Sequence, residues 1–158
     1  MKRIKIHPID QIPGQSMGAQ GFVYKPIIAP TSPEAQGCHI AFVEVPPQGA
    51  SFAYHYHEMD EEAFYIISGR GLVRTPYGQI EVRPGDAVTF PAGPEGAHAI
   101  SNPSKTEKLV YIDFDTHHLP EITHFPDTGA VEVLGPFSAT VYEQGQGVPS
   151  QNPRRRSE

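Results

Sequence analysis

The chain has one cysteine, Cys38, among its 158 residues. An internal disulfide is therefore excluded, and a reducing compartment, the cytoplasm, is the expected location. Long apolar runs are missing as well. The N-terminal sequence MKRIKIHPID has no apolar stretch before Pro8, and no segment is long and apolar enough to span a membrane. We therefore expect neither a signal peptide nor a membrane partner.

Basic clusters are also scarce. The formal net charge is -6, and the only dense basic run lies at residues 154–156. Nucleic-acid binding normally leaves a broad basic patch in the sequence, and no phosphate-loop or dinucleotide fingerprint occurs. Nucleic acid is therefore not an expected partner, and a small-molecule substrate or ligand is.

Turn-forming residues, by contrast, are abundant, with 17 prolines and 15 glycines. Between residues 38 and 115 they separate apolar segments of strand length, HIAFVEV, AFYIIS, LVRT, QIEV, AVTF, HAIS and KLVYIDF. These segments lack a convincing 3.6-residue period, so helix should be minor. Short strands at this spacing predict an all-β sandwich or barrel.

The distribution of breakpoints divides the chain into four parts. Residues 1–36 carry many prolines and glycines and predict an extended N-terminal arm, while residues 37–116 predict the barrel core. Residues 117–149 predict a C-terminal extension that packs on the barrel. The polar stretch at 150–158 predicts a disordered tail.

Histidines and acidic residues gather between residues 55 and 62. His55 and His57 are two apart, which in a strand places both imidazoles on one face, where they can bind one ion. A carboxylate from the next strand can join them, and both Glu61 and Glu62 are in range. His98 opens an apolar strand after a Gly/Pro-rich loop and is the fourth candidate ligand.

The same residues resemble the cupin superfamily. The first cupin motif, Gly-x5-His-x-His-x4-Glu-x6-Gly, is matched without a spacing change by Gly49, His55, His57, Glu62 and Gly69. The second cupin motif, Gly-x5-Pro-x-Gly-x2-His-x3-Asn, is matched by Gly85, Pro91, Gly93, His98 and Asn102 with one departure. Four residues rather than two separate Gly93 from His98. This difference predicts a loop insertion before His98.

The resemblance covers about half of the chain and implies a double-stranded β-helix, the cupin jelly-roll barrel. It implies Glu62 rather than Glu61 as the carboxylate ligand, so that His55, His57, Glu62 and His98 hold one divalent metal ion. Mixed imidazole and carboxylate ligands suit Zn, Mn, Fe or Ni, and the sequence does not rank them. The arm and the resemblance together imply a homodimer.

Further side chains are candidates for contact with a substrate. Arg70 and Arg74 follow the metal motif and could bind an anionic group through two hydrogen bonds. Phe64 and Ile66 share the parity of Glu62 and are expected to line the pocket. The remaining histidines, including His39, receive no role, and no residue can be named as a general base.

Three functions compete at this stage. The segment EEAFYIISGRGLVRT looks like that of small bacterial cupins described as sugar-phosphate isomerase-like, so a metal-dependent isomerase leads. An iron-dependent dioxygenase of a small organic substrate is an alternative. A non-catalytic barrel that binds a small ligand is a second alternative, because residue spacing alone identifies no general base.

Overall fold

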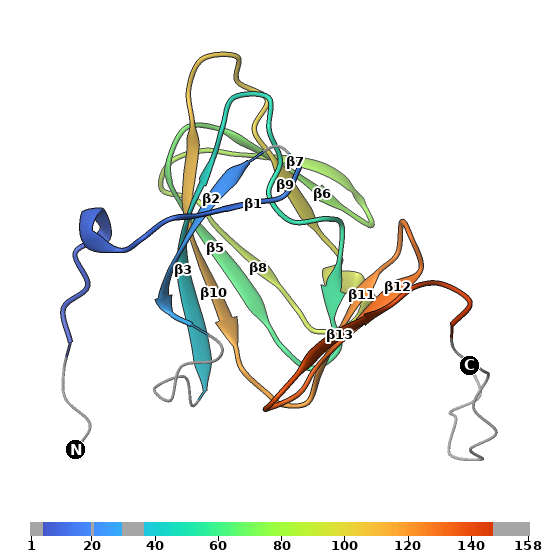
Figure 1. The fold of residues 1–158 in the computed structure, drawn as a ribbon. Coiled ribbons are helices and arrows are strands. Elements are labelled where there is room, and N and C mark those ends of the chain that lie inside the picture. Colours follow the sequence, from blue (N-terminus) through green and yellow to red (C-terminus); the bar gives the residue numbers. More distant parts are fainter. Residues whose placement is uncertain (1–4, 20, 30–36, 147–158) are drawn as a thin grey trace.

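The computed structural model describes residues 5–19, 21–29 and 37–146. Figure 1 shows a body built from strands. Two short 3-10 helices also occur among the described residues. In chain order the elements are η1 (Ile9–Gln11), β1 (Gln15–Met17), β2 (Phe22–Ile28), β3 (Cys38–Val45), β4 (Tyr56–His57), β5 (Glu62–Ser68), β6 (Gly71–Thr75), β7 (Gly78–Val82), β8 (Ala87–Phe90), η2 (Pro94–Gly96), β9 (Ala99–Ser101), β10 (Leu109–Thr116), β11 (Glu121–Phe125), β12 (Ala130–Leu134) and β13 (Ala139–Tyr142). The predicted all-β jelly-roll barrel with little helix is confirmed. Within the described ranges, no helix has the length and apolarity needed to cross a membrane.

The largest sheet has six antiparallel strands in the order β1-β2-β3-β10-β5-β8. Alternation along these strands sends every second side chain inward. On β10, Leu109 and Tyr111 are fully buried between their neighbours, whereas Phe114 faces outward and is 38% exposed. The inward residues of the sheet form one core cluster: Phe22, Ala41, Val43, Val45, Phe64, Ile66, Phe90, Leu109 and Tyr111, together with Val73, Val82 and Ile100 from the strands that face it.

Two smaller antiparallel sheets close the barrel. One has the order β7-β6-β9 and the other the order β13-β12-β11-β4. In Figure 1 both lie on the side opposite β3, β10 and β5. β4 is only two residues long, but its pairing with β11 ties the segment that holds His57 to the C-terminal part of the chain, through Thr123 opposite His57.

Several motif residues shape the backbone. The Asn102 side-chain amide donates to the carbonyl oxygens of Val45, Pro46 and Glu107 at 3.1, 3.1 and 2.8 Å, while its oxygen accepts from the Ser104 amide at 3.0 Å. Asn102 thereby fastens the loop before β10 to the end of β3. Gly69 has φ +79°, and a Cβ there would lie 2.2 Å from the Lys108 oxygen, so the turn requires glycine.

Segments on both sides of the predicted core pair with other strands of the barrel. β2 pairs with β3, and Phe22 is 1% exposed and belongs to the core cluster. Residues 121–142 of the extension form three strands of the second smaller sheet. The predicted tail, 150–158, lies outside the described residues.

Candidate metal centre

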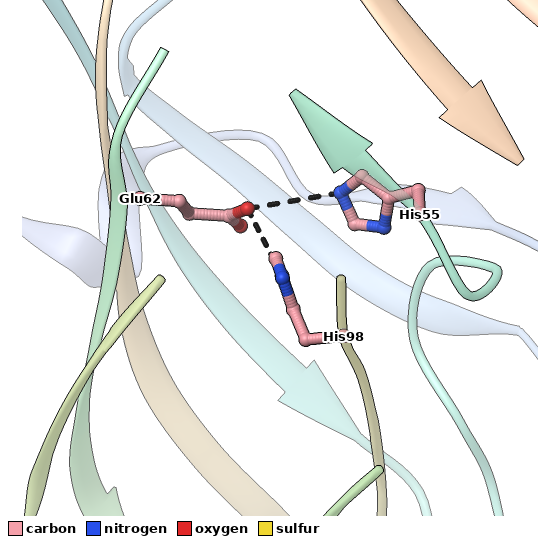
Figure 2. Close-up of side chains that lie close together, drawn as sticks. All are labelled: His55, Glu62 and His98. Carbon is pink, nitrogen blue, oxygen red and sulfur yellow. Dashed lines mark ion pairs between the residues drawn. The ribbon is translucent and has the colours of Figure 1, made fainter. Parts of the chain in front are cut away.

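His98 comes from a distant part of the sequence and joins His55 and Glu62, which lie in neighbouring segments, at one end of the barrel. Glu62 begins β5, His55 directly precedes β4, and His98 directly precedes β9. Two backbone hydrogen bonds hold the histidines side by side: the His55 amide donates to the His98 oxygen at 3.0 Å, and the His98 amide donates to the His55 oxygen at 2.8 Å. Figure 2 shows both rings pointing toward the Glu62 carboxylate from different sides.

One oxygen of Glu62 is the common point of the site. Glu62 Oε2 lies 3.0 Å from His98 Nε2, 3.5 Å from His57 Nε2 and 3.7 Å from His55 Nε2. Ligand atoms about 2.1 Å from a shared metal ion are about 3.0 to 3.4 Å apart, depending on the coordination angle. The separation from His98 Nε2 falls within this range, and those from His57 and His55 are slightly longer. His55, Glu62 and His98 offer ligand atoms that all lie within 4.8 Å of one another, whereas His57 forms such a group with Glu62 and Asp115.

The orientation of two imidazoles is fixed by the backbone. His55 Nδ1 donates to the Ala53 oxygen at 2.7 Å, and His98 Nδ1 donates to the Gly96 oxygen at 2.9 Å. A carbonyl oxygen only accepts, so the proton of each neutral ring is assigned to Nδ1 and the lone pair to Nε2. The ring of Phe90 stacks on His98 at 3.6 Å between centroids and limits its rotation.

The four residues before His98 are accommodated without displacing it. Pro94–Gly96 form η2, and the compact turn brings Gly96 against Pro91, where a Cβ would lie 1.8 Å from the Pro91 oxygen. The turn returns the chain to the backbone bridge with His55. The predicted loop insertion is therefore a single 3-10 turn, and His98 remains beside His55 and Glu62.

His57 occupies a different position in the set. Its Nε2 faces Glu62, while its Nδ1 lies 3.4 Å from Thr123 Oγ1 and 3.7 Å from Glu121 Oε1. Burial by itself would lower the pKa of His57, but Glu62, Asp115 and Glu121 together raise it to about 9. His57 is thus the imidazole that the surrounding carboxylates most strongly favour as a cation.

Burial and neighbouring charges shift the pKa values of His55 and Glu62. Burial is the main cause that lowers the pKa of His55 to about 4, so this ring is neutral and able to bind a metal at neutral pH. Burial opposes ionisation of Glu62, but His98, His57 and His55 hold its pKa well below the usual value. The set therefore contains an anionic oxygen surrounded by imidazole nitrogens.

Two buried atoms lack a hydrogen-bond partner here, Glu62 Oε2 and His98 Nε2. They face each other at 3.0 Å, and since His98 carries its proton on Nδ1, both atoms present lone pairs. Such a contact is unfavourable unless a cation or a proton lies between them. The mixed imidazole and carboxylate set fits a divalent ion such as Zn, Mn, Fe or Ni.

His55, His57 and Glu62 line a cavity of about 370 Å³, within the range of small-molecule sites, whereas His98 is 1% exposed and lies outside its lining. The wall includes the apolar residues Met17, Phe52, Phe125 and Leu134. It also carries six acidic residues: Asp60, Glu62, Asp113, Asp115, Glu121 and Glu132. The cavity wall therefore combines apolar and acidic side chains.

Several of these groups received no role from the sequence. Asp113 and Asp115 are 2% and 3% exposed, and His39 Nε2 lies 2.6 Å from Asp115 Oδ2. Burial, then Glu62, raises the pKa of Asp115 to about 6, and the same causes raise that of Asp113 well above its usual value. Glu121 Oε1 accepts from the amides of Glu58 and Met59.

A signal for two of them was present in the segment LVYIDFD. Asp113 and Asp115 have the same parity as Leu109 and Tyr111, so two acidic residues continue the inward face of an apolar strand. The pairing of Asp115 with both Glu62 and His39 across neighbouring strands depends on the sheet order. That order is not evident from local spacing.

The structure does not bring the predicted substrate-binding residues to this cavity. Arg70 is exposed and pairs with Glu81, and Arg74 is exposed, pairs with Asp127 at 2.6 and 2.8 Å and lies over the ring of Tyr54. Phe64 and Ile66 do point inward, at 2% and 0% exposure, but they pack in the core below the site.

Comparison with known proteins assigns the fold to a class. The family model described as the cupin domain matches residues 41–115, a segment that contains His55, His57, Glu62 and His98. Residues 41–115 therefore form a cupin domain of the cupin superfamily. A curated relative, an uncharacterized protein of Methanocaldococcus jannaschii, is 38% identical over 56 residues, or 35% of this chain. That match spans 43% of the relative, less than half of its length.

Solved structures similar to this chain include named enzymes. A sugar phosphate isomerase from a cupin superfamily of Silicibacter pomeroyi is 16% identical, with a TM-score of 0.77 over 93% of this chain and 98% of that one. A protein of Acidithiobacillus ferrooxidans with the provisional name sugar phosphate isomerase is 24% identical, with a TM-score of 0.70 over 82% of each chain. The polyketide cyclase RemF of Streptomyces resistomycificus is 21% identical, with a TM-score of 0.64 over 75% of this chain and 84% of that one.

Proposed function

We propose that the protein is a metal-dependent enzyme that isomerises a small carbonyl-bearing molecule in this cavity. The observation that carries the proposal is the pair of buried, unpartnered atoms Glu62 Oε2 and His98 Nε2, which face each other 3.0 Å apart. His55 and His57 direct their Nε2 atoms to the same oxygen. A divalent ion held by these residues would polarise a carbonyl or hydroxyl oxygen of the substrate.

The chain also offers a base. Moving a hydrogen between adjacent carbon atoms needs a group that removes a proton from one carbon and returns it to the other. His39 and Asp115 both line the cavity and are paired at 2.6 Å. A carboxylate oxygen of Asp115 lies within 4.8 Å of ligand atoms of His57 and Glu62. A small molecule beside the metal ligands would therefore be within reach of the pair.

The names of similar structures guide the choice of reaction class. Two are named as sugar phosphate isomerases, one of them provisionally, and a third as a polyketide cyclase. Because all three identities are below 25%, these names support the proposal only as a starting class of chemistry. The isomerase proposal requires no external oxidant or reductant, since the proton removed from one carbon is added to its neighbour.

The other two functions make different demands. A dioxygenase needs iron in the site, because redox-inactive zinc cannot activate oxygen. A non-catalytic binding barrel was favoured by the lack of a general base, and the pairing of His39 with Asp115 weakens that reason. The cytoplasmic location and the homodimer rest on the sequence and stay predictions.

Elemental analysis of protein purified without added metal or chelator tests the first step. We expect about one divalent ion per chain in the wild type and its loss in Glu62→Ala. Proton exchange on a panel of aldoses and ketoses in D2O, followed by NMR, then tests the reaction. His39→Asn should keep the metal and lose the exchange, because it removes the base and no metal ligand. Retained exchange in this variant, or a wild type without metal, would count against the proposed function.

A further inference from the structure

Besides Glu62, three carboxylates of the cavity have oxygen atoms with no hydrogen-bond partner among the described residues. They are Asp113 Oδ1, Asp115 Oδ2 and Glu121 Oε2, on side chains that are 2%, 3% and 2% exposed. Asp115 Oδ2 faces the ring of His39, and the Asp113 carboxyl interacts with that of Glu62, whereas Glu121 Oε2 has no such neighbour in the described part of the chain. Buried acceptor atoms normally receive a hydrogen bond, so a ligand that fits this cavity should offer hydrogen-bond donors to these oxygens.

Two aromatic residues of the cavity wall suit the face of a ring. Phe52 and Phe125 both line the cavity, with ring centroids 6.4 and 6.2 Å from the ring of His55. Flat apolar surfaces of this kind pack against ring faces, while groups on the ring edge remain free for hydrogen bonds. A ring packed against these aromatics would lie next to the candidate ligand His55.

The charge of the cavity opposes an anionic ligand. Six acidic side chains line the cavity. Among the described residues, no lysine or arginine lines it. The cations Lys25 and Lys108 pair with Glu44, and Arg74 pairs with Asp127, outside the cavity. A divalent ion and a protonated His57 offset only part of the charge of the five other acidic side chains, because Asp113 is held in its neutral form. A phosphate group placed beside Glu121 therefore meets net repulsion.

From these observations we infer that the cavity binds an uncharged ring compound with neighbouring hydroxyl groups and discriminates against the phosphorylated form of such a compound. Hydroxyl groups can place an oxygen at the metal and donate protons to Asp113 and Glu121, which neither a phosphate nor an ammonium group can do together. The inference rests on the proposed function, and it departs from the sugar phosphate that the sequence resemblance implies.

Calorimetric titration of the full chain, loaded with the metal found by elemental analysis, tests the inference. The probes are fructose, fructose 6-phosphate and catechol, so that sugar and aromatic sources of the hydroxyl pair are distinguished. We expect fructose or catechol to bind. If the ligand class is a sugar, fructose 6-phosphate should bind at least about tenfold more weakly than fructose, or show no binding. Equal or tighter binding of the phosphate, or no binding of either hydroxyl probe, would overturn the inference.

Variants assign the discrimination to the carboxylates. Glu121→Gln keeps the shape and removes a charge, so it should weaken binding of the hydroxyl probe about tenfold and reduce the discrimination against phosphate. Asp113→Asn keeps the shape and removes an acceptor oxygen, so it should weaken binding of the hydroxyl probe. Glu132→Gln, at a half-buried position of the same wall, serves if the buried variants fail to fold. Glu81→Gln, an exposed acid paired with Arg70, is the matched control and should change nothing.

Binding ratios require no turnover, which separates the two proposals. Proton exchange that fails while the binding ratio holds would remove the enzyme and keep the ligand class. Normal metal content and normal proton exchange, combined with tighter binding of fructose 6-phosphate than of fructose, would keep the enzyme and remove the proposed ligand class.

Discussion

Replacing Glu62 by Gln should remove most of the stability that a bound metal adds to the protein. Glu62 Oε2 is the atom that faces all three imidazoles, at 3.0, 3.5 and 3.7 Å, and Gln offers no negative charge at that point. A ligand that binds only the folded state stabilises it by about 4 kcal/mol at a concentration 1,000 times its Kd. For a chain of this size that is a rise in Tm of about 8 to 16 °C.

The expected loss follows from the same relation. Removing partners outside the metal's direct ligands already weakens binding by about 10- to 100-fold, so loss of a charged ligand should weaken it by about 100-fold or more. At fixed metal concentration a 100-fold loss removes about 2.7 kcal/mol, leaving an increment of a few degrees. The measured quantity is the difference in Tm with and without metal, so a change in the metal-free stability of the variant cancels.

Glu61 provides a control one residue away. Its side chain is exposed, and the contact it makes with Thr116 is through its backbone amide, which donates to Thr116 Oγ1 at 2.8 Å. Glu61→Gln should therefore keep the full increment in a thermal scan. A Glu62→Gln variant that retains the wild-type increment, or a Glu61→Gln variant that loses it, would refute the assignment of Glu62 as the central ligand.

Three further outcomes are expected. Asn102→Ala should lower the free energy of unfolding by about 3 kcal/mol, since both N–H donors, shared among three carbonyl oxygens, and one acceptor are lost; denaturant titration giving less than 1 kcal/mol would contradict this role. Gly96→Ala should lower metal content, because its Cβ would lie 1.8 Å from the Pro91 oxygen and displace the turn before His98, whereas Gly37→Ala, with open space around its Cβ, should not. Light scattering should show a dimer, and Tyr65→Asp, on the outer face of the large sheet at 51% exposure, should give a monomer if that face is the interface; a monomeric wild type would end the dimer prediction.

The sequence was most informative where chemistry follows from local spacing. A two-residue interval places His55 and His57 in one short segment, and the motif spacing selects Glu62, which is buried, over its exposed neighbour Glu61. Even the irregular interval before His98 could be predicted as an insertion. What could not be predicted was its form, a 3-10 turn that the close approach of Gly96 to Pro91 makes possible.

The sequence was less informative about how deep in the barrel an inward side chain lies and about which strands pair. Parity correctly sends Phe64 and Ile66 inward, but β5 runs away from the cavity after Glu62, so each later inward residue lies deeper in the core. Parity also marks Asp113 and Asp115, yet only the sheet order puts Asp115 opposite both Glu62 and His39. Periodicity gives the face of a residue, whereas its position along the barrel requires the register.

The metal ligands and part of the cavity wall come from different parts of the chain. His55, His57, Glu62 and His98 lie within residues 41–115, the segment matched by the cupin family, whereas Met17, Glu121, Phe125 and Leu134 lie outside it. Proteins that share the matched segment can therefore share a metal centre and still differ in what they bind. The two parts are not independent, because β11 pairs with β4 and sets Thr123 opposite His57. A change in the β11 wall that alters ligand choice would also act on the imidazole closest to it, so substrate class and metal centre are coupled through this one strand pair.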